Sequence, residues 1–259
     1  MTPTITTRIA AVIPARDEEL AIGSVVAGLR NLRSDNGEAL IDSIVVCDNG
    51  SRDQTADMAL RAGAKVVHQP VAGYGLACLT AIGQLHDEDI LLFVDGDNAF
   101  RAEQALPLIA AINCGADLAI GSRVLGKMEP GALTFPQRFG NRLASLLIRI
   151  IWGAQVTDLG PFRAIRWESY RRLHMADRGF GWTVEMQVKA IQQGIKLVEV
   201  PVDTYRRIGR SKISGTLKGT VGAAHGILSM IARLWWQDRR QPRLGEDISP
   251  LTPMGDTER

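Results

Sequence analysis

The sequence predicts an α/β fold in which helices cover both faces of a mostly parallel sheet. Over about the first 125 residues, short β-branched runs alternate with longer segments that carry apolar residues at helical spacing. The strand-like runs are almost continuously apolar, which is typical of strands buried on both faces of a parallel sheet. A chain of 259 residues with 46% hydrophobic and 22% charged residues is long enough to form a large core of this kind.

Six apolar segments of strand length are bounded by turn residues and are predicted as strands. These segments are 8–15, 41–50, 65–69, 89–97, 116–124 and 196–202. Helical spacing of apolar residues predicts helices between and after them. The predicted helices are 17–32, 51–64, 73–85, 102–115, 138–153 and 182–194.

Composition excludes several classes of protein. Cys47, Cys78 and Cys114 lie far apart, without a CxxC pair or a histidine at ligand spacing, so we expect a reduced, cytoplasmic protein without a zinc site. The first residues have neither a basic start nor a long apolar core, so no signal peptide is expected. No apolar run reaches the ~20 residues that a membrane-spanning helix needs. The net charge of +2 gives no reason to expect a nucleic-acid partner.

Charged side chains follow four of the predicted strands at the same edge of the sheet. Acidic residues occur in the strand ends at 14–18, 48–51 and 95–97, and Arg123 ends the segment 121–123. Ligands of open parallel sheets bind beyond the carboxyl ends of the strands. One acidic strand end is commonly a helix cap, but several at one edge indicate a binding site.

The spacing of Asp95 and Asp97 fits a divalent metal that carries a diphosphate. Magnesium prefers oxygen ligands, keeps several waters and usually takes one or two protein carboxylates. The alternative is a strand-to-helix turn in which Asp97 or Asn98 caps a helix at 101–112.

The glycines of "GYGLACLTAIG" allow two interpretations. Gly73 and Gly75 permit a tight turn, and the helix that follows could bind phosphate at its N-terminus. The pattern differs from GxGxxG, so glycine used for close packing is an equally good interpretation.

Taken together, the motifs resemble those of family 2 glycosyltransferases, in particular the branch that makes dolichyl- or polyprenyl-phosphate sugars. The resemblance covers about residues 8–220. It implies a GT-A fold, a Rossmann-like nucleotide-diphospho-sugar transferase domain, and inverting transfer that uses Mg²⁺ or Mn²⁺. The motifs occur in the family's order: "VIPARDEE", "IVVCDNGSRDQT", "GYGLA", "LLFVDGDN", "LAIGSRV", "VTDLGPFRAI", "WTVEMQVKA" and "RRIGRSKISGT".

The resemblance also implies roles for individual residues. Asp97 would be the principal metal ligand, with Asp95 beside it approaching the nucleotide-sugar. Asp158 would face the transferred sugar and the acceptor, as a base if the acceptor is a hydroxyl. The other residues expected to bind the nucleotide-sugar are Pro14, Ala15, Glu18, Asp48, Gly73, Arg123, Arg206 or Arg207, and Lys212. Those expected on the acceptor side are Arg138, Arg163 and Glu185.

Three motifs depart from the family pattern. Arg16 and Asp17 stand where an aromatic residue and Asn are usual, which leaves the stacking partner of the base open. Asn49 replaces one carboxylate, and Ala99 stands where Gln often completes the metal site.

A basic, apolar segment near the C-terminus predicts attachment to a membrane surface. Residues 204–237 contain no Asp or Glu and include Trp235 and Trp236, and helix 139–152 offers a second surface of this kind. Basic residues beside an apolar stretch with Trp are typical of interfacial anchors. The alternative is that both segments pack on the sheet or form a dimer contact.

We therefore expect one GT-A domain over 1–237, followed by a disordered tail at 238–259. Within it, 8–125 would bind the nucleotide-sugar, 126–218 the acceptor, and 219–237 would form an amphipathic, interfacial helix. The expected activity is hexosyl transfer from a UDP-hexose, or alternatively GDP-mannose, to a polyprenyl or dolichyl phosphate by a peripheral enzyme at the cytoplasmic face of the membrane. Two alternatives remain: transfer to a soluble hydroxyl or glycan acceptor, and a non-catalytic nucleotide-sugar-binding module.

Overall fold

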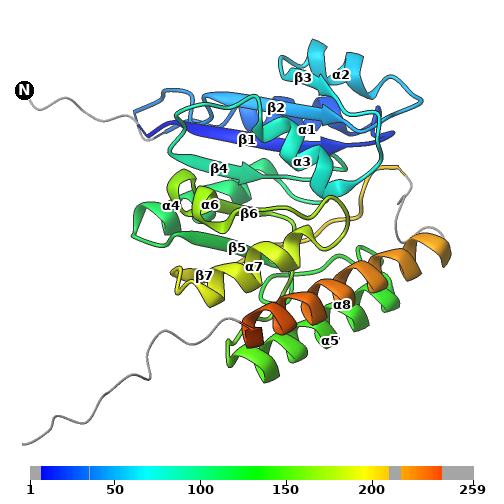
Figure 1. The fold of residues 1–259 in the computed structure, drawn as a ribbon. Helices are drawn as coiled ribbons and strands as arrows, with labels where there is room; N and C mark the ends of the chain where they lie inside the picture. The colour runs from blue at the N-terminus through cyan, green and yellow to red at the C-terminus, as the bar shows by residue number, and fades with distance from the viewer. Residues whose placement is uncertain (1–6, 35, 210–216, 241–259) are drawn as a thin grey trace, which may run out of the picture.

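A seven-stranded sheet forms the centre of the computed structural model, which describes residues 7–34, 36–209 and 217–240 (Figure 1). Its strand order is β3-β2-β1-β4-β6-β5-β7. Neighbouring strands are parallel except β6, which is antiparallel to both β4 and β5, so the predicted mostly parallel sheet is confirmed. The strands are β1 (Ile9–Ala15), β2 (Ser43–Asp48), β3 (Lys65–His68), β4 (Ile90–Phe93), β5 (Leu118–Ser122), β6 (Arg163–Arg166) and β7 (Leu197–Pro201).

Helices cover the sheet on both faces, as the apolar strands predict. Along β1, Ile9, Ala11 and Ile13 enter one core with α1, α2 and α4, whereas Ala10 and Val12 enter the opposite core with α3, α6 and α7. Alternate side chains of a strand point to opposite faces, so every residue of β1 is buried. The helices are α1 (Ile22–Arg30), α2 (Thr55–Arg61), α3 (Tyr74–Ile82), α4 (Ala105–Asn113), α5 (Phe135–Trp152), α6 (Trp167–Leu173), α7 (Trp182–Gln192) and α8 (Leu217–Arg240), with a 3₁₀ turn at Ala102–Gln104 before α4.

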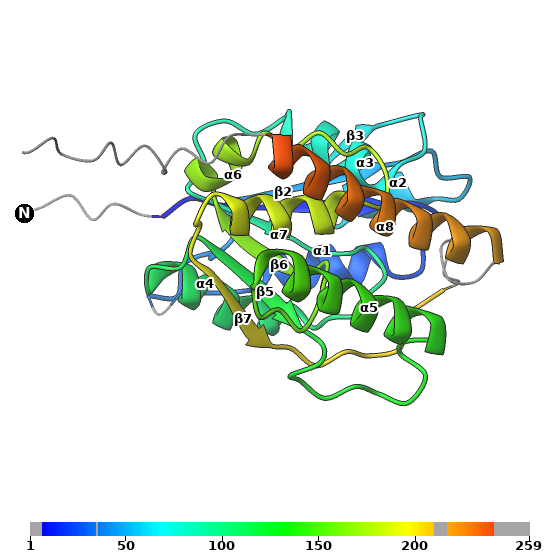
Figure 2. The same ribbon diagram turned by 60° about the horizontal axis from the view of Figure 1, so that its bottom comes forward.

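Helices α5 and α8 lie side by side next to α7, outside the layers that cover the sheet (Figure 2). Ala144 and Ile148 of α5 pack with Ile231 and Leu234 of α8 and with Val184 of α7 in a third apolar cluster. Helix α5 begins with a capping box at Thr134, whose backbone N–H donates to the side chain of Gln137 at 2.8 Å. No helix in the described part of the chain combines the length and apolarity needed to cross a bilayer.

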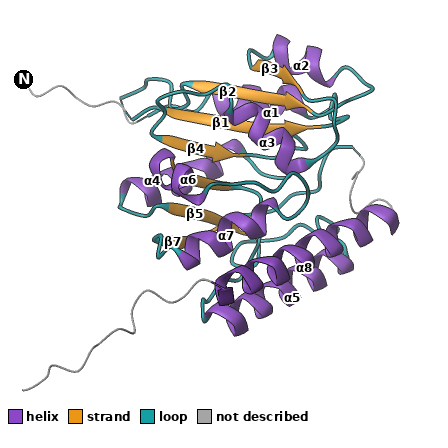
Figure 3. Cartoon of the chain, viewed as in Figure 1, coloured by secondary structure: helices purple, strands orange, loops and turns teal. Residues whose placement is uncertain are grey.

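The six predicted strands are all present (Figure 3), and each is shorter than the segment that predicts it. The run at 89–97 is strand from Ile90 to Phe93, and the Asp-Gly-Asp sequence lies in the turn that follows. The carboxyl ends of β1, β2 and β4 point to one edge of the sheet, where this turn lies (Figure 3).

Strand β6 is a feature that the sequence does not predict, because two of its four residues are arginines. Since β6 runs against its neighbours, its first residue, Arg163, lies at the edge where the parallel strands end. The preceding segment, 157–162, is thereby brought beside β5 and Ser122, whose hydroxyl lies 2.7 Å from Thr157 Oγ1. The antiparallel strand thus adds Asp158 to an edge otherwise formed by parallel strands.

Near the C-terminus, α8 is longer than the expected helix at 219–237, because it extends from Leu217 to Arg240. The first three residues of the expected tail are therefore helical, and 241–259 lie outside the described residues.

Candidate active site

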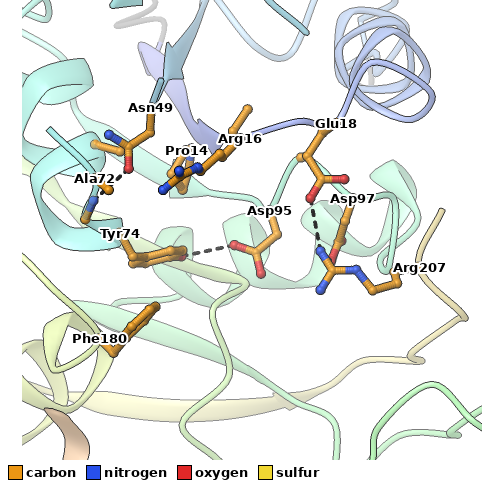
Figure 4. A pocket seen from close by; sticks show the side chains of 14 residues that line it. Pro14, Arg16, Glu18, Asn49, Ala72, Tyr74, Asp95, Asp97, Phe180 and Arg207 are labelled. Atoms are coloured by element: carbon orange, nitrogen blue, oxygen red, sulfur yellow. Dashed lines mark hydrogen bonds and ion pairs between the residues drawn. The ribbon is translucent and has the colours of Figure 1, made fainter. Parts of the chain in front are cut away.

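A cavity of about 320 Å³ opens at the carboxyl edge of the sheet, between the ends of β1, β2 and β4 (Figure 4). Many of the residues expected to bind a nucleotide-sugar or its metal line it: Pro14, Ala15, Glu18, Gly73, Asp95, Asp97 and Arg207. Arg16, Asn49, Tyr74 and Phe180 line it as well, without having been assigned a role by the sequence.

Tyr74 fixes one oxygen of Asp95 in this cavity. Its hydroxyl donates to Asp95 Oδ1 at 3.1 Å (Figure 4). Removal of the carboxyl from water and the negative charge of Asp97 together raise the pKa of Asp95 to about 7, although the Tyr74 hydrogen bond, Arg207 and Arg123 act in the opposite direction. A cation beside Asp95 would therefore stabilise the charged form of its carboxyl, which has lost contact with water.

Asp97 is paired with an arginine in this structure. Arg207 Nη2 lies 2.9 Å from Asp97 Oδ2 and 3.1 Å from Glu18 Oε1, so that one guanidinium nitrogen joins two carboxylates (Figure 4). The contact is set by the backbone, because Ile208 N–H donates to Asp97 O and Tyr205 N–H donates to Ala99 O, both at 2.9 Å.

Asp97 does not cap a helix. Its Oδ1 accepts the N–H of Ala99 at 3.0 Å, which tightens the turn, whereas the helical segment starts at Ala102 and is capped around Arg101 and Gln104. Neither Asp97 nor Asn98 therefore takes the role that the capping alternative requires. Asn98 has a φ of 59°, in the left-handed region that is uncommon for a residue other than glycine.

The two adjacent arginines of this segment lie in different surroundings. Arg206 Nε donates to Pro130 O at 2.6 Å, and its backbone N–H donates to Glu129 Oε2 at 2.7 Å. Of the pair expected at the diphosphate, the cavity is thus lined by Arg207 and not by Arg206. Lys212 lies outside the described residues.

Asp158, expected to face the sugar and the acceptor, is fully buried against Arg123. Arg123 donates to Asp158 Oδ2 through Nε at 2.8 Å and through its backbone N–H at 2.7 Å, and to Oδ1 through Nη2 at 2.6 Å. Burial alone would lower the pKa of Arg123, but the charge of Asp158 and these hydrogen bonds raise it. In this arrangement Asp158 holds Arg123 and offers no free oxygen to a substrate.

Arg163 also lies below the surface, which corrects its expected place on the acceptor side. It is completely buried, and its guanidinium donates to backbone carbonyls of Leu159, Gly160 and Thr183. Burial lowers its pKa to about 10, so that it keeps its charge at neutral pH. Arg163 therefore supports the loop that carries Asp158, and a phosphate cannot reach it without unpacking that loop.

Glu185, which was also expected on the acceptor side, is instead buried and holds a neighbouring loop in place. Its buried carboxylate accepts the backbone N–H of Asp177 at 2.7 Å and of Ala176 at 3.1 Å, and pairs with Lys189 at 2.8 Å. The loop at 174–181 carries Phe180 to the cavity (Figure 4). Glu185 thus acts on the cavity through this loop.

Arg138, the third residue expected on the acceptor side, is exposed on α5.

The same loop explains the glycines at the start of α3. The amides of Gly75 and Leu76 donate to the carbonyls of Gly179 and Arg178 at 3.1 and 3.0 Å. A Cβ atom on Gly75 would lie 2.1 Å from the carbonyl oxygen of Asp177, and one on Gly73 would lie 2.2 Å from that of Arg178. Close packing of the loop therefore accounts for these glycines, and the amides of 75 and 76 are not available to a phosphate.

Asp48 lies next to the cavity without lining it. Its Oδ2 is 3.2 Å from His68 Nδ1, and its Oδ1 accepts the N–H of Ser51 at 3.1 Å. The neighbouring Asn49 does line the cavity, where its side chain accepts the N–H of Gly73 and donates to the carbonyl oxygens of Gln69 and Val71.

The cavity suits a metal that is completed by a ligand. Asp95 and Asp97 face the same space, and the positive charge of Arg207 already lies against Asp97. No cluster of three or more His, Cys, Asp or Glu side chains that could hold a metal occurs within the described part of the chain. Mg²⁺ at phosphate sites is commonly bound by one or two protein carboxylates, and waters and phosphate oxygens complete its coordination. Asp95 and Asp97 fit this pattern.

Comparison with known proteins gives a consistent result. The model of the family described as "Glycosyl transferase family 2" matches residues 10–173. Glycosyltransferase AglJ of Haloferax volcanii is 34% identical over 195 residues, which are 75% of this chain and 62% of that protein, so the chain spans less than two thirds of its length. Undecaprenyl-phosphate mannosyltransferase of Micrococcus luteus is 31% identical over 227 residues, covering 82% of this chain and 90% of that protein.

A solved structure shares the fold at low sequence identity. Glucosyl-3-phosphoglycerate synthase from Mycobacterium tuberculosis, crystallised with Mn²⁺, uridine diphosphate and phosphoglyceric acid, superposes with a TM-score of 0.70 at 20% identity. The match covers 88% of this chain and 78% of that chain.

Replacing Gly75 with Ala should destabilise the protein, because the new methyl group collides with a backbone carbonyl. We expect a loss of about 1–3 kcal/mol in the free energy of unfolding, measured by urea denaturation. Gly140→Ala is the matched control, because Gly140 lies within α5 and an added Cβ there would meet nothing within 4 Å. That change should be neutral or stabilise by up to ~1 kcal/mol. Equal effects of the two changes would contradict the packing role of Gly75.

Asp95→Asn should stabilise the metal-free protein at alkaline pH. A carboxyl whose pKa is raised from 3.8 to about 7 on folding makes the protein less stable as pH rises between those two values. With EDTA present, we expect the variant to exceed the wild type by on the order of 1 kcal/mol at pH 8.5 and by much less at pH 5. A variant advantage that is larger at pH 5 than at pH 8.5 would contradict the raised pKa.

Proposed function

Because the chain belongs to glycosyl transferase family 2, we propose that it is an inverting, metal-dependent transferase that moves a hexose from a nucleoside-diphosphate sugar, favouring UDP-hexose, to a polyprenyl or dolichyl phosphate. The chain has the GT-A fold expected from the sequence, with a mostly parallel seven-stranded sheet between helices. The observation that carries the proposal is the cavity in which Asp95, Asp97 and Arg207 meet at the carboxyl edge of that sheet.

The arrangement of charges supports a diphosphate donor. Asp95 and Asp97 would hold Mg²⁺ or Mn²⁺, which supplies positive charge to the diphosphate as the glycosidic bond breaks. Arg207 lines the same cavity, and its planar guanidinium can donate two parallel hydrogen bonds to phosphate oxygens. The structural neighbour from M. tuberculosis was crystallised with uridine diphosphate and Mn²⁺, which agrees with this chemistry and with uridine as the preferred base.

The uncharged walls of the cavity support the binding of a nucleoside next to these charges. Pro14, Ala15 and Ala72 line it together with the rings of Tyr74 and Phe180. Phe180 is 36% exposed and stands on the opposite side of the cavity from Pro14 and Arg16 (Figure 4). An aromatic ring at this position offers a stacking partner for a base, in place of the aromatic residue that the first motif lacks.

A phosphate acceptor fits the state of Asp158. A lipid phosphate is already an anionic nucleophile, so its attack on the anomeric carbon does not need a strong general base. Asp158 has both oxygens bonded to Arg123, which leaves it suited to holding that cation in place. Arg123 would then bring positive charge toward the phosphate of the acceptor or donor.

Helix α5 supports a lipid rather than a soluble acceptor. Its exposed Phe135, Phe139, Leu146 and Ile150 are spaced so that they fall on one face of the helix. Arg138, Arg142 and Arg149 are exposed beside them, and Trp235 and Trp236 are exposed on the neighbouring α8. Apolar and aromatic residues flanked by arginines suit the surface of an anionic membrane, which agrees with the undecaprenyl phosphate in the name of the M. luteus relative.

The activity is tested with a panel of nucleotide-sugars, with and without polyprenyl phosphate, by measuring release of nucleoside diphosphate in Mg²⁺ or Mn²⁺. We expect release to require both the lipid phosphate and the metal. Asp97→Ala should lower kcat/KM at least ~100-fold, because the diphosphate loses its electrostatic stabilisation. Asp57→Ala is the control, since Asp57 is exposed on α2. Release with soluble hydroxyl acceptors alone would refute the lipid acceptor, and a panel without any turnover would favour a binding module.

Membrane attachment is tested by sedimentation with vesicles of anionic or zwitterionic lipid. The double change Phe135→Ser and Phe139→Ser should weaken binding to anionic vesicles by roughly tenfold, because two apolar rings no longer enter the interface. Leu106→Ser is the control, since Leu106 is 41% exposed on α4 and lies away from this surface. A monomer–dimer change in place of altered vesicle binding would show that the apolar face of α5 is a contact between copies.

A further inference from the structure

Arg207 lies where a cation bound to Asp97 would lie. Its Nη2 is 2.9 Å from Asp97 Oδ2, and the same atom donates to Glu18 Oε1 at 3.1 Å. Asp97 and Glu18 are both buried, with 7% of each residue exposed. The guanidinium therefore neutralises two buried carboxylates at the floor of the cavity (Figure 4).

This contact and metal binding compete for the same carboxylate. A metal ion at Asp97 would stand beside the guanidinium nitrogen that lies 2.9 Å from Oδ2, and two cations at one carboxylate repel each other. The repulsion is strongest inside a protein, where charges are screened less than in water. A metal ion that enters therefore favours movement of the guanidinium away from Asp97.

The contact is also incomplete, which favours its release. Arg207 Nε is buried and has no hydrogen-bond partner among the described residues. A buried donor without an acceptor costs free energy, so a ligand that offers acceptors to Nε and to the displaced Nη2 would gain from both. A diphosphate offers such acceptors and matches the guanidinium fork.

We propose that Arg207 is a latch that keeps a lone metal ion out of the empty donor site and is transferred to the diphosphate when the donor arrives. The inference rests on the proposed function, because it takes the metal and the nucleoside diphosphate as the ligands of this cavity. It gives Arg207 a role in determining the order in which the metal and the nucleoside diphosphate bind. Metal and nucleoside diphosphate bind together, and each binds weakly without the other.

The backbone gives the latch its position. Ile208 N–H donates to Asp97 O, and Tyr205 N–H donates to Ala99 O, so the segment of Arg207 is fastened to the turn that carries Asp97. Because the backbone is fastened on both sides of Arg207, the proposed transfer of its guanidinium is a movement of the side chain. Arg206, one residue earlier, instead contacts Pro130 and Glu129 outside the cavity.

The latch is tested by titrating Mn²⁺ into nucleotide-free protein and following free Mn²⁺ by electron paramagnetic resonance, with a repeat in saturating UDP. The apparent affinity of a ligand falls with the fraction of protein that is competent to bind it. A latch closed in roughly nine of ten molecules predicts that Arg207→Ala and Arg207→Gln bind Mn²⁺ alone about tenfold more tightly than the wild type. In UDP, the order of affinities should reverse, because neither variant brings positive charge to the diphosphate.

Arg206→Ala is the matched control, because it removes one positive charge from the same segment without touching Asp97. It should leave the affinity for Mn²⁺ alone within about twofold of the wild type, as expected for an exposed and screened charge. The latch is refuted if neither Arg207 variant binds Mn²⁺ more tightly, or if Arg206→Ala gains as much as they do. Failure of the wild type to bind Mn²⁺ even in UDP would instead refute the proposed function.

Discussion

The rest of the site depends on two carboxylates that lie at the end of one buried strand. Asp95 and Asp97 follow β4 directly, and each loses solvation in a cavity where the other repels it. The raised pKa of Asp95 records this cost. The fold tolerates the pair because positive charge comes close to it. Arg207 contacts Asp97 directly, and Arg123, the residue after β5, attracts both carboxylates. A bound metal would add further positive charge beside the two carboxylates, and a diphosphate would add negative charge that pairs with the metal and with Arg207.

The supporting residues act on these charges from a distance. Antiparallel β6 places Asp158 beside Arg123, and the buried guanidinium of Arg163 holds the carbonyls of the same loop. On the other side, Glu185 fixes the loop that carries Phe180, and that loop in turn packs on Gly75. Three residues with the charges expected of a substrate site are thus used inside the protein. Their burial explains why charge in a motif does not by itself indicate contact with a ligand.

The sequence allows the sheet and the position of the site to be predicted, because both follow from local patterns. Apolar runs identify six strands, of which β7 carries one internal charge at Glu199, and the rule for carboxyl ends brings Asp95 and Asp97 to one edge. Strand β6 escapes prediction because Arg163 and Arg166 occupy half of it, and no local pattern reveals that Arg163 is buried. The choice between Arg206 and Arg207 depends on backbone pairing with the turn at 97–99, a contact between segments more than one hundred residues apart. Asp158 likewise finds Arg123 across 35 residues, and its motif gives no sign of that partner.

The most direct test of this account is the position of Mn²⁺ in crystals grown with UDP, located by anomalous scattering. We expect the peak beside the Asp97 carboxylate and within reach of Asp95, with the Arg207 guanidinium moved from Asp97 to the diphosphate. A peak away from both carboxylates would contradict the assignment of the cavity as a metal–diphosphate site. A peak at Asp97 with Arg207 still paired to the same carboxylate would contradict the claim that the metal displaces the arginine.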